Sequence, residues 1–286
     1  MWNSPDFLDV SDRAGKPRDR GLTHVLDKGV TIPALDAWLV QIGHLVDVIK
    51  IGWGIAYIDP VVKERVAVCH AAGVMVSLGG TLLEVAVAQD RLTKLRRWAA
   101  DLGVDALEVS NGLGAMAPQR KAALIHELSG EFIVLAETGL KSGTVPVVTD
   151  AWLAEMEADL AAGARWLIAE GRESGSAGLY ETDGSVRASL VEAIVAGLPA
   201  ERIIFEAPRT AQQSWMVRHL GANVSLGNIP LEEVLPLETL RLGLRADTAR
   251  LPDRDVEAPP WRSLTRYRTP SPVLTGGCRC RRSRSH

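Results

Sequence analysis

The sequence predicts an α/β protein that folds as one (β/α)₈ TIM barrel with parallel strands. Its 286 residues accommodate this fold, which usually needs about 250 residues. Short apolar runs rich in β-branched residues alternate with amphipathic stretches rich in alanine and leucine, which is the order expected of repeated strand–helix units. Eight such runs occur, and eight parallel strands are enough to close a barrel.

Each predicted strand is followed by room for a helix. The strands are expected at residues 23–26, 46–51, 74–78, 106–110, 132–136, 166–169, 203–205 and 224–226. Their spacing of roughly 20 to 36 residues fits one strand, one helix and two loops per unit. A helix over 90–102 is expected to end at Gly103, because glycine is favoured at C-caps. Asp150 is expected to cap a helix over 151–162.

The two ends of the chain differ in composition from the region between them. Residues 1–19 are polar and are predicted to form an N-terminal arm, whereas residues 20–250 form the barrel and carry the catalytic site. Residues 251–286 contain five prolines and finish in an arginine-rich segment, a composition that can bury little apolar surface. We therefore expect this tail to be partly disordered.

The overall composition excludes several classes of protein. Charged residues make up 23% of the chain and the net charge is −3, so no nucleic-acid partner is expected. No apolar run approaches the roughly 20 residues that span a bilayer, and the first residues lack the order of a signal peptide. The three cysteines suggest no disulfide framework. We expect a cytoplasmic protein without a membrane partner.

Polar residues gather where the predicted strands end, and this is the face that carries the active site in TIM barrels. The candidates are Asp27, Lys50, Gly79, Gly80, Glu108, Ser110, Glu137, Lys141, Glu170, Arg172, Glu206, Arg209, Gly227 and Asn228. Burying so many charges is costly unless they pair with one another, hold a metal or clamp a charged substrate. Any single glutamate could be a salt-bridge partner, but the complete ring indicates a site.

The residue types narrow the chemistry of this predicted site. Carboxylates without neighbouring histidine or cysteine favour a hard cation, and Mg²⁺ commonly binds one or two carboxylates together with substrate oxygens. Positive charge for a small anionic, phosphorylated substrate is available from Lys50, Lys141, Arg172 and Arg209. The sequence therefore favours a site for Mg²⁺ and an anionic substrate.

Glycines at two strand ends and the histidines carry weaker signals. Gly79 and Gly80, and Gly227 before Asn228, can bring backbone N–H groups to a phosphate, although such glycines are also common in plain turns. His24 lies inside the first predicted strand, and no histidine in the sequence shows metal-ligand spacing. We therefore assign no catalytic histidine.

Several segments at the predicted strand ends form a recognisable set. They are RGLT at 20–23, LDKG at 26–29, KIGWG at 50–54, GGTLLE at 79–84, EVS at 108–110, EGRESG at 170–175, FEAP at 205–208 and LETLR at 237–241. In this order, over residues 20–250, they resemble the phosphosulfolactate synthase family, which has heat-stress-associated relatives.

This resemblance implies a Mg²⁺-dependent carbon–sulfur lyase that adds sulfite to C3 of phosphoenolpyruvate and gives (2R)-O-phospho-3-sulfolactate. It assigns catalysis to Lys141, Glu137 and Lys50, with Lys141 delivering a proton to C2 because it matches the family's Glu-x-Gly-x-Lys segment. The resemblance implies that rim carboxylates hold the metal, and we assign Glu108, Glu170 and Glu206. Substrate binding is assigned to Asp27, Gly79, Gly80, Ser110, Arg172, Arg209, Gly227 and Asn228. Family members commonly assemble, so a homo-oligomer is expected.

Departures from the family pattern leave two alternatives open. Ile55, Ala56, Asn111, Leu140 and Ser225 replace residues that are typically polar or charged in the family. The first alternative is a paralogue that uses phosphoenolpyruvate, or another phosphorylated enol, with a different nucleophile or acceptor. The second is a stress-associated barrel without activity, although a degraded site would be expected to lose its charged rim.

Overall fold

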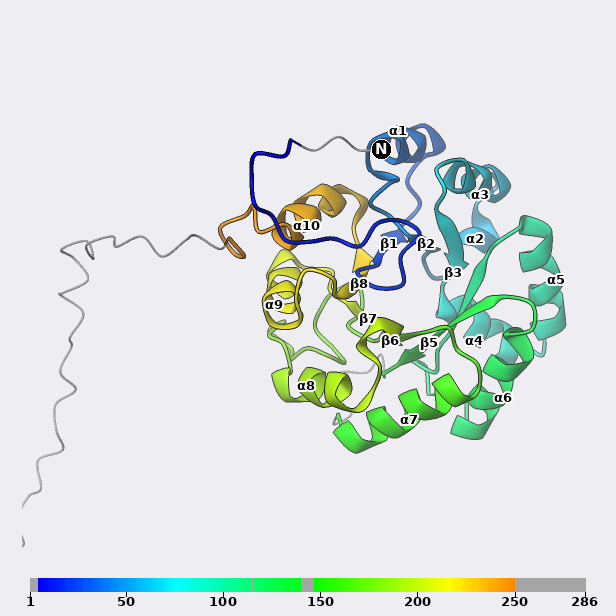
Figure 1. Ribbon diagram of the computed structural model, residues 1–286. Helices are drawn as coiled ribbons and strands as arrows, with labels where there is room; N and C mark the ends of the chain where they lie inside the picture. Colours follow the sequence, from blue (N-terminus) through cyan, green and yellow to red (C-terminus); the bar gives the residue numbers. More distant parts are fainter. Residues whose placement is uncertain (1–4, 115, 140–146, 250–286) are drawn as a thin grey trace, which may run out of the picture. The chain divides into compact units, whose positions relative to one another are not determined.

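The eight predicted strands form a closed barrel in which all neighbouring strands are parallel (Figure 1). The computed structural model describes residues 5–114, 116–139 and 147–249. The strands pair in sequence order, and β8 closes the barrel against β1. The predicted TIM barrel is therefore confirmed.

The strands lie at or within a few residues of their predicted positions. They are β1 (Thr23–Asp27), β2 (Val48–Ile51), β3 (Met75–Leu78), β4 (Ala106–Val109), β5 (Ile133–Thr138), β6 (Trp166–Ala169), β7 (Ile203–Glu206) and β8 (Ser225–Ile229). The largest differences are at carboxyl ends, because β5 and β8 continue past the apolar residues that mark them in the sequence. Glu137 and Asn228 thus belong to strands and not to the loops that follow.

Helices surround the strands as an outer ring (Figure 1). They are α1 (Ile32–Ile42), α2 (Ile55–Ile58), α3 (Val62–Ala71), α4 (Gly80–Ala88), α5 (Leu92–Leu102), α6 (Pro118–Leu128), α7 (Thr149–Ala161), α8 (Ala188–Gly197), α9 (Thr210–Leu220) and α10 (Val234–Arg241). In the described part of the chain, no helix is long and apolar enough to cross a membrane.

Two predictions about helix ends have different outcomes. Gly103 ends α5 in the left-handed conformation, with φ of 77°, as predicted for a C-cap glycine. The prediction that Asp150 caps α7 is wrong, because the helix begins at Thr149, two residues earlier than predicted, and Val148 is its N-cap. Asp150 lies in the first turn, where a negative charge still complements the helix dipole.

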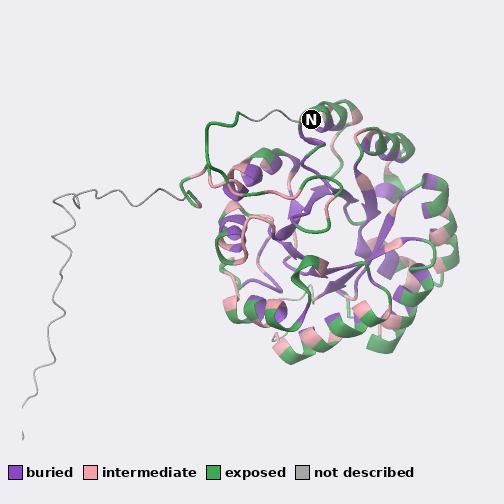
Figure 2. Cartoon of the chain, in the orientation of Figure 1, coloured by how far each residue is buried: buried purple, intermediate pink, exposed green. Residues whose placement is uncertain are grey.

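The strands are buried on both faces, as Figure 2 shows by the purple barrel inside a ring of partly exposed helices. Side chains alternate along a strand, so residues two positions apart face the same side. A small apolar cluster includes Ala106, Leu135, Ile168 and Ile204. Each of these is followed two residues later by a glutamate. An apolar layer in the barrel interior is therefore overlaid by a layer of carboxylates.

Candidate active site

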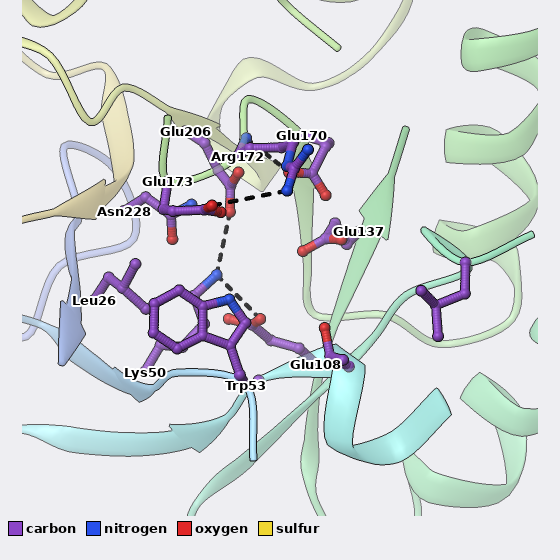
Figure 3. Close-up of a pocket in the computed structure, with 14 residues that line it drawn as sticks. Leu26, Lys50, Trp53, Glu108, Glu137, Glu170, Arg172, Glu173, Glu206 and Asn228 are labelled. Atoms are coloured by element: carbon purple, nitrogen blue, oxygen red, sulfur yellow. Dashed lines mark hydrogen bonds and ion pairs between the residues drawn. The ribbon is translucent and has the colours of Figure 1, made fainter. Parts of the chain in front are cut away.

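A cavity of about 150 Å³ opens among the carboxyl ends of the strands (Figure 3). Its lining consists of Leu26, Lys50, Trp53, Gly79, Gly80, Thr81, Glu108, Leu113, Glu137, Glu170, Arg172, Glu173, Glu206 and Asn228. Pockets for drug-sized ligands usually measure about 300–1,000 Å³, so this cavity suits a much smaller molecule. Its position is the one expected for the active site of a TIM barrel.

Lys50 is held at the centre of the site by two carboxylates (Figure 3). Its Nζ lies 3.2 Å from Glu108 Oε2 and 3.1 Å from Glu206 Oε1, and all three side chains are buried. The second oxygen of Glu206 accepts a hydrogen bond of 2.9 Å from the backbone N–H of Gly171. These contacts join strands β2, β4 and β7 across the barrel and fix the position of the ammonium group.

The same contacts keep Lys50 charged. Burial disfavours the ammonium ion, but the neighbouring carboxylates of Glu108 and Glu206 outweigh burial and raise the pKa of Lys50 above its ordinary value. Burial also acts against the charged form of Glu108, yet Lys50 and His24 together lower the pKa of this carboxyl. Lys50 is therefore a permanent cation suited to binding an anion, and not a group that readily gives up a proton.

His24 supports Glu108 from the far side. Its Nε2 lies 3.0 Å from Glu108 Oε1, and the imidazole is fully buried. The sequence analysis gave this histidine no role, although its position two residues before Leu26 places both on one side of β1. Leu26 lines the cavity, so strand alternation alone places His24 toward the barrel interior.

Among the described residues that line the cavity, carboxylates outnumber cations. Glu108, Glu137, Glu170 and Glu206 are all buried and line it. The described cations of the lining are Lys50 and Arg172, and the Arg172 side chain is 39% exposed and lies 3.8 Å from Glu173. An excess of buried carboxylates is costly unless a further cation neutralises it. The oxygen donors and this charge excess both fit a hard divalent cation.

Mg²⁺ would need help from substrate or water to bind here. Among the described residues, no group of three or more His, Cys, Asp and Glu side chains is placed to hold a metal ion by itself. Mg²⁺ usually keeps several waters and uses one or two protein carboxylates together with substrate oxygens, so the lining still fits this ion. The assignment of Glu108, Glu170 and Glu206 to the metal stays a prediction.

Gly79 and Gly80 are required by close packing beside the cavity. A Cβ on Gly79 would lie 3.1 Å from the backbone nitrogen of Trp53, and one on Gly80 would lie 2.8 Å from Ser110 Cβ. Gly80 begins α4, so the amino end of this helix borders the cavity together with Thr81. Backbone N–H groups at such an end favour anions.

Many predicted site residues lie in the cavity lining. They are Lys50, Gly79, Gly80, Glu108, Glu137, Glu170, Arg172, Glu206 and Asn228. Lys141 lies outside the described residues, and its assignment as proton donor stays a prediction. The lining residues that were not assigned to the site are Leu26, Trp53, Thr81, Leu113 and Glu173, and all of them except Leu113 belong to motifs that mark it.

Four predicted substrate-binding residues lie outside the lining. Asp27 is buried against Arg65, with 2.7 Å between its Oδ2 and Arg65 Nη1, and the carboxylate also accepts N–H groups of the following loop. Ser110 donates to Glu84, and a Cβ on Gly227 would lie 3.2 Å from His24 Nδ1. Arg209 directs Nη1 toward the carbonyl of Asp183, at 3.5 Å. These contacts position backbone and neighbouring side chains around the site.

The sequence and structure were compared with known proteins. Residues 11–247 match the family model described as (2R)-phospho-3-sulfolactate synthase (ComA). The chain is 40% identical over 253 residues to the phosphosulfolactate synthase of Methanothermobacter thermautotrophicus, covering 86% of this chain and 97% of that protein. It is 34% identical over 247 residues to the phosphosulfolactate synthase of Bacillus subtilis, covering 85% and 98%.

Solved structures support the fold alone. The 3-hexulose-6-phosphate synthase of Salmonella typhimurium gives a TM-score of 0.52 at 14% identity, covering 77% of this chain and 98% of that one. The YdjI aldolase of Escherichia coli gives 0.51 at 13% identity, covering 78% and 86%. At such low identity the resemblance concerns the barrel and not its chemistry.

Proposed function

The chain belongs to the (2R)-phospho-3-sulfolactate synthase family, and we propose that it is a lyase adding sulfite to C3 of phosphoenolpyruvate to give (2R)-O-phospho-3-sulfolactate. The observation that carries this proposal is the fixed ammonium group of Lys50 inside a small cavity rich in carboxylates. Such a site suits a small trianionic substrate that brings a divalent cation with it.

Charge stabilisation is the main demand of the proposed reaction. Sulfite is already a good nucleophile, whereas its attack on C3 places negative charge on C2 and the adjoining carboxylate of the substrate. A fixed cation in a buried site stabilises such charge without rearrangement during the reaction. Lys50 meets this requirement, because Glu108 and Glu206 hold its position and keep it protonated.

Arg172 and the amino end of α4 are suited to the substrate's phosphate. Arg172 lines the cavity and is partly exposed, so its guanidinium can offer two donors to a phosphate. Gly79, Gly80 and Thr81 bring the backbone close to the same cavity. We assign these groups to the phosphate, and Lys50 to the carboxylate and the developing charge.

We propose Mg²⁺ as the cofactor, held by one or two of the carboxylates Glu108, Glu170 and Glu206 together with substrate oxygens and water. When bound, this ion supplies Lewis-acid stabilisation of the substrate carboxylate. The oxygen donors of the buried carboxylates among the described lining residues support the assignment. For the protons, we propose Lys141 as the acid that protonates C2, which leaves Lys50 as the permanent cation.

The departures from the family pattern do not favour a different reaction. Asn111 exchanges two hydrogen bonds with the backbone of Met116, at 2.8 and 2.9 Å, and so shapes its own loop. Ser225 accepts the backbone N–H of Leu22 at 3.1 Å. Ile55 and Ala56 begin α2, and none of these four residues belongs to the described lining of the cavity. Leu140 lies outside the described residues.

The proposal is tested by ³¹P NMR of the purified full-length chain with phosphoenolpyruvate, sulfite and Mg²⁺. We expect the phosphoenolpyruvate signal to give way to that of a phosphomonoester, and mass spectrometry should show that the product contains one added sulfonate. A parallel sample without protein gives the uncatalysed rate. Product formation no faster than in that sample contradicts the proposal.

A further inference from the structure

Backbone strain is concentrated at the cavity. In the part of the chain that the structure describes, four residues other than glycine have positive φ, and three of them line the cavity. These three are Trp53 at 47°, Arg172 at 58° and Asn228 at 54°. The fourth, Asp90, is exposed in the turn between α4 and α5. Strain of this kind persists where the surrounding structure enforces it, which is common at functional sites.

Trp53 has the most unfavourable of these conformations. Asn and Asp tolerate the left-handed region, but a bulky side chain there is an outlier. Trp53 is the second residue of a turn closed by a 3.1 Å hydrogen bond from the N–H of Ile55 to the carbonyl of Gly52. Gly54 beside it has an ordinary φ of −100°, so the glycine of this turn does not relieve the strain.

Close packing holds the backbone of Trp53 in this conformation. A Cβ on Gly79 would lie 3.1 Å from the Trp53 nitrogen, and a Cβ on Gly52 would lie 2.9 Å from Leu26 Cδ1. The turn is thus packed against the ends of β1 and β3, and a side chain on Gly79 would press on the main chain of the turn. The neighbouring strands therefore fix where the indole lies.

The indole is one of three large apolar side chains in the described lining of the cavity. These are Leu26, Trp53 and Leu113, and the other described side chains of the lining are polar or charged. Trp53 is 40% exposed, so the indole lies where the cavity meets solvent (Figure 3). Phosphoenolpyruvate likewise has charged and apolar parts, since its carboxylate and phosphate are charged and its methylene carbon is apolar.

We infer that Trp53 is a further substrate-contacting residue that determines specificity, because its indole lies beside the methylene end of the enol. This inference rests on the proposed function. With the charged groups of the substrate directed to Lys50 and Arg172, the methylene carbon lies against the edge of the indole. The indole leaves no room for a methyl group at that edge of C3, whereas sulfite reaches C3 from a face of the enol that the indole does not cover.

The test compares phosphoenolpyruvate with its homologue that carries one methyl group on C3, both with sulfite and Mg²⁺. One extra methylene in a tight pocket typically changes kcat/KM by about 10- to 200-fold, and we expect the wild type to discriminate within this range. Trp53→Ala should reduce this discrimination at least about tenfold. Trp53→Phe, which keeps an aromatic wall, should retain most of it. Trp98→Ala, in α5 and outside the described lining of the cavity, is the matched control and should leave the ratio unchanged.

Each outcome bears on one claim. An unchanged ratio in Trp53→Ala overturns the inference, as does an equal change in Trp98→Ala. No product from the wild type with either substrate contradicts the proposed function instead. A Trp53→Gly variant separates the backbone from the indole: it should melt about 2–4 °C above Trp53→Ala, since glycine relieves the strain. Equal melting temperatures would show that the backbone conformation carries no strain.

Discussion

The two ends of the barrel both bury charged side chains, but they do so in different ways. At the amino ends of the strands, the buried guanidinium of Arg241 donates to the carbonyls of Ala222 at 2.7 Å, Val224 at 2.6 Å and Leu22 at 3.2 Å. At the carboxyl ends, Lys50 is surrounded by carboxylates that line a cavity. At the amino ends, the cation is bound by main-chain carbonyls. At the carboxyl ends, the carboxylates face a cavity.

This difference separates a structural cluster from a functional one. Arg241 ties the chain around β8 to the start of β1, and Arg13 of the N-terminal arm pairs with Glu238 of α10 at 2.9 Å nearby. Burial lowers the pKa of Arg241 to about 9, so this cation is retained at a cost for the contacts it makes. The carboxylates that line the cavity also join strands through Lys50, but they face an open space, and their charge is suited to a ligand.

The largest effect is expected for Lys50→Met. Removing the ammonium group leaves Glu108 and Glu206 facing each other and takes away the fixed cation of the site. We expect kcat/KM to fall by about 10³-fold or more. Steady-state kinetics with phosphoenolpyruvate and sulfite measure this, and circular dichroism checks the fold. A folded variant with activity near the wild type would show that the mouth does not depend on this cation.

Arg241→Met should have the opposite pattern. Three carbonyls lose this charged donor, although Arg13 still donates to that of Ala222 and the N–H of Leu226 to that of Leu22. Removing a buried charged partner typically costs about 3 kcal/mol. We expect the free energy of unfolding in urea to drop by this amount, while kcat per folded molecule stays close to the wild type. If Arg241→Met lost kcat without losing stability, Arg241 would have a role in activity and not a structural role.

The next effect concerns Lys141, the proposed proton donor. Lys141→Ala should leave the fold intact and slow the chemical step by about 10²-fold or more, if this lysine protonates C2. Single-turnover measurements isolate the chemical step from product release. Because Lys50 stays protonated through Glu108 and Glu206, it cannot take over this role readily. Normal turnover in Lys141→Ala would refute the assignment.

The smallest effect is expected at a buried cluster behind β5. Lys121 donates to the carbonyl of Glu137 at 2.8 Å and to Asp159 at 2.6 Å. Burial raises the pKa of Asp159 from 3.8 to about 6, although Lys121 opposes the shift. The Asp159 carboxyl therefore holds its proton more tightly in the folded state than in the unfolded state. The resulting contribution to the free energy of unfolding is fully present below pH 4 and is lost as the pH rises through 6.

Asp159→Asn removes that titration. The stability of the wild type relative to Asp159→Asn should fall by about 2–3 kcal/mol between pH 4 and pH 7. Urea unfolding at several pH values measures the difference. Parallel stability curves would mean that Asp159 does not titrate in this range. As with Arg241, we expect the effect on stability and not on the chemistry at the mouth.

The barrel and most of its mouth could be predicted from the sequence, because both follow from strand alternation. Lys50, Glu108 and Glu206 lie at strand positions that face the interior, and each lines the cavity. Asp27 also ends a strand, but it alternates with His24 and Leu26 and so faces outward to Arg65. Strand alternation places His24 on the interior face of β1 and Asp27 on the opposite face.

Loops and backbone strain could not be predicted in this way. Arg209 follows a strand, yet its direction is set by the loop around Asp183, which no periodicity describes. The positive φ of Trp53 results from the packing of Gly52 and Gly79 against neighbouring strands. Residue propensities favour the opposite, with glycine in the strained position and tryptophan outside it.

Calorimetric titration of phosphoenolpyruvate measures whether the carboxylate-rich cavity, with Lys50, holds an anionic substrate together with a divalent cation. With Mg²⁺ present, we expect the wild type to bind one equivalent per chain, and EDTA or the Lys50→Met substitution should weaken binding at least about tenfold. Arg241→Met should bind like the wild type. Binding that is unaffected by EDTA and by Lys50→Met would show that neither the divalent cation nor Lys50 holds the substrate.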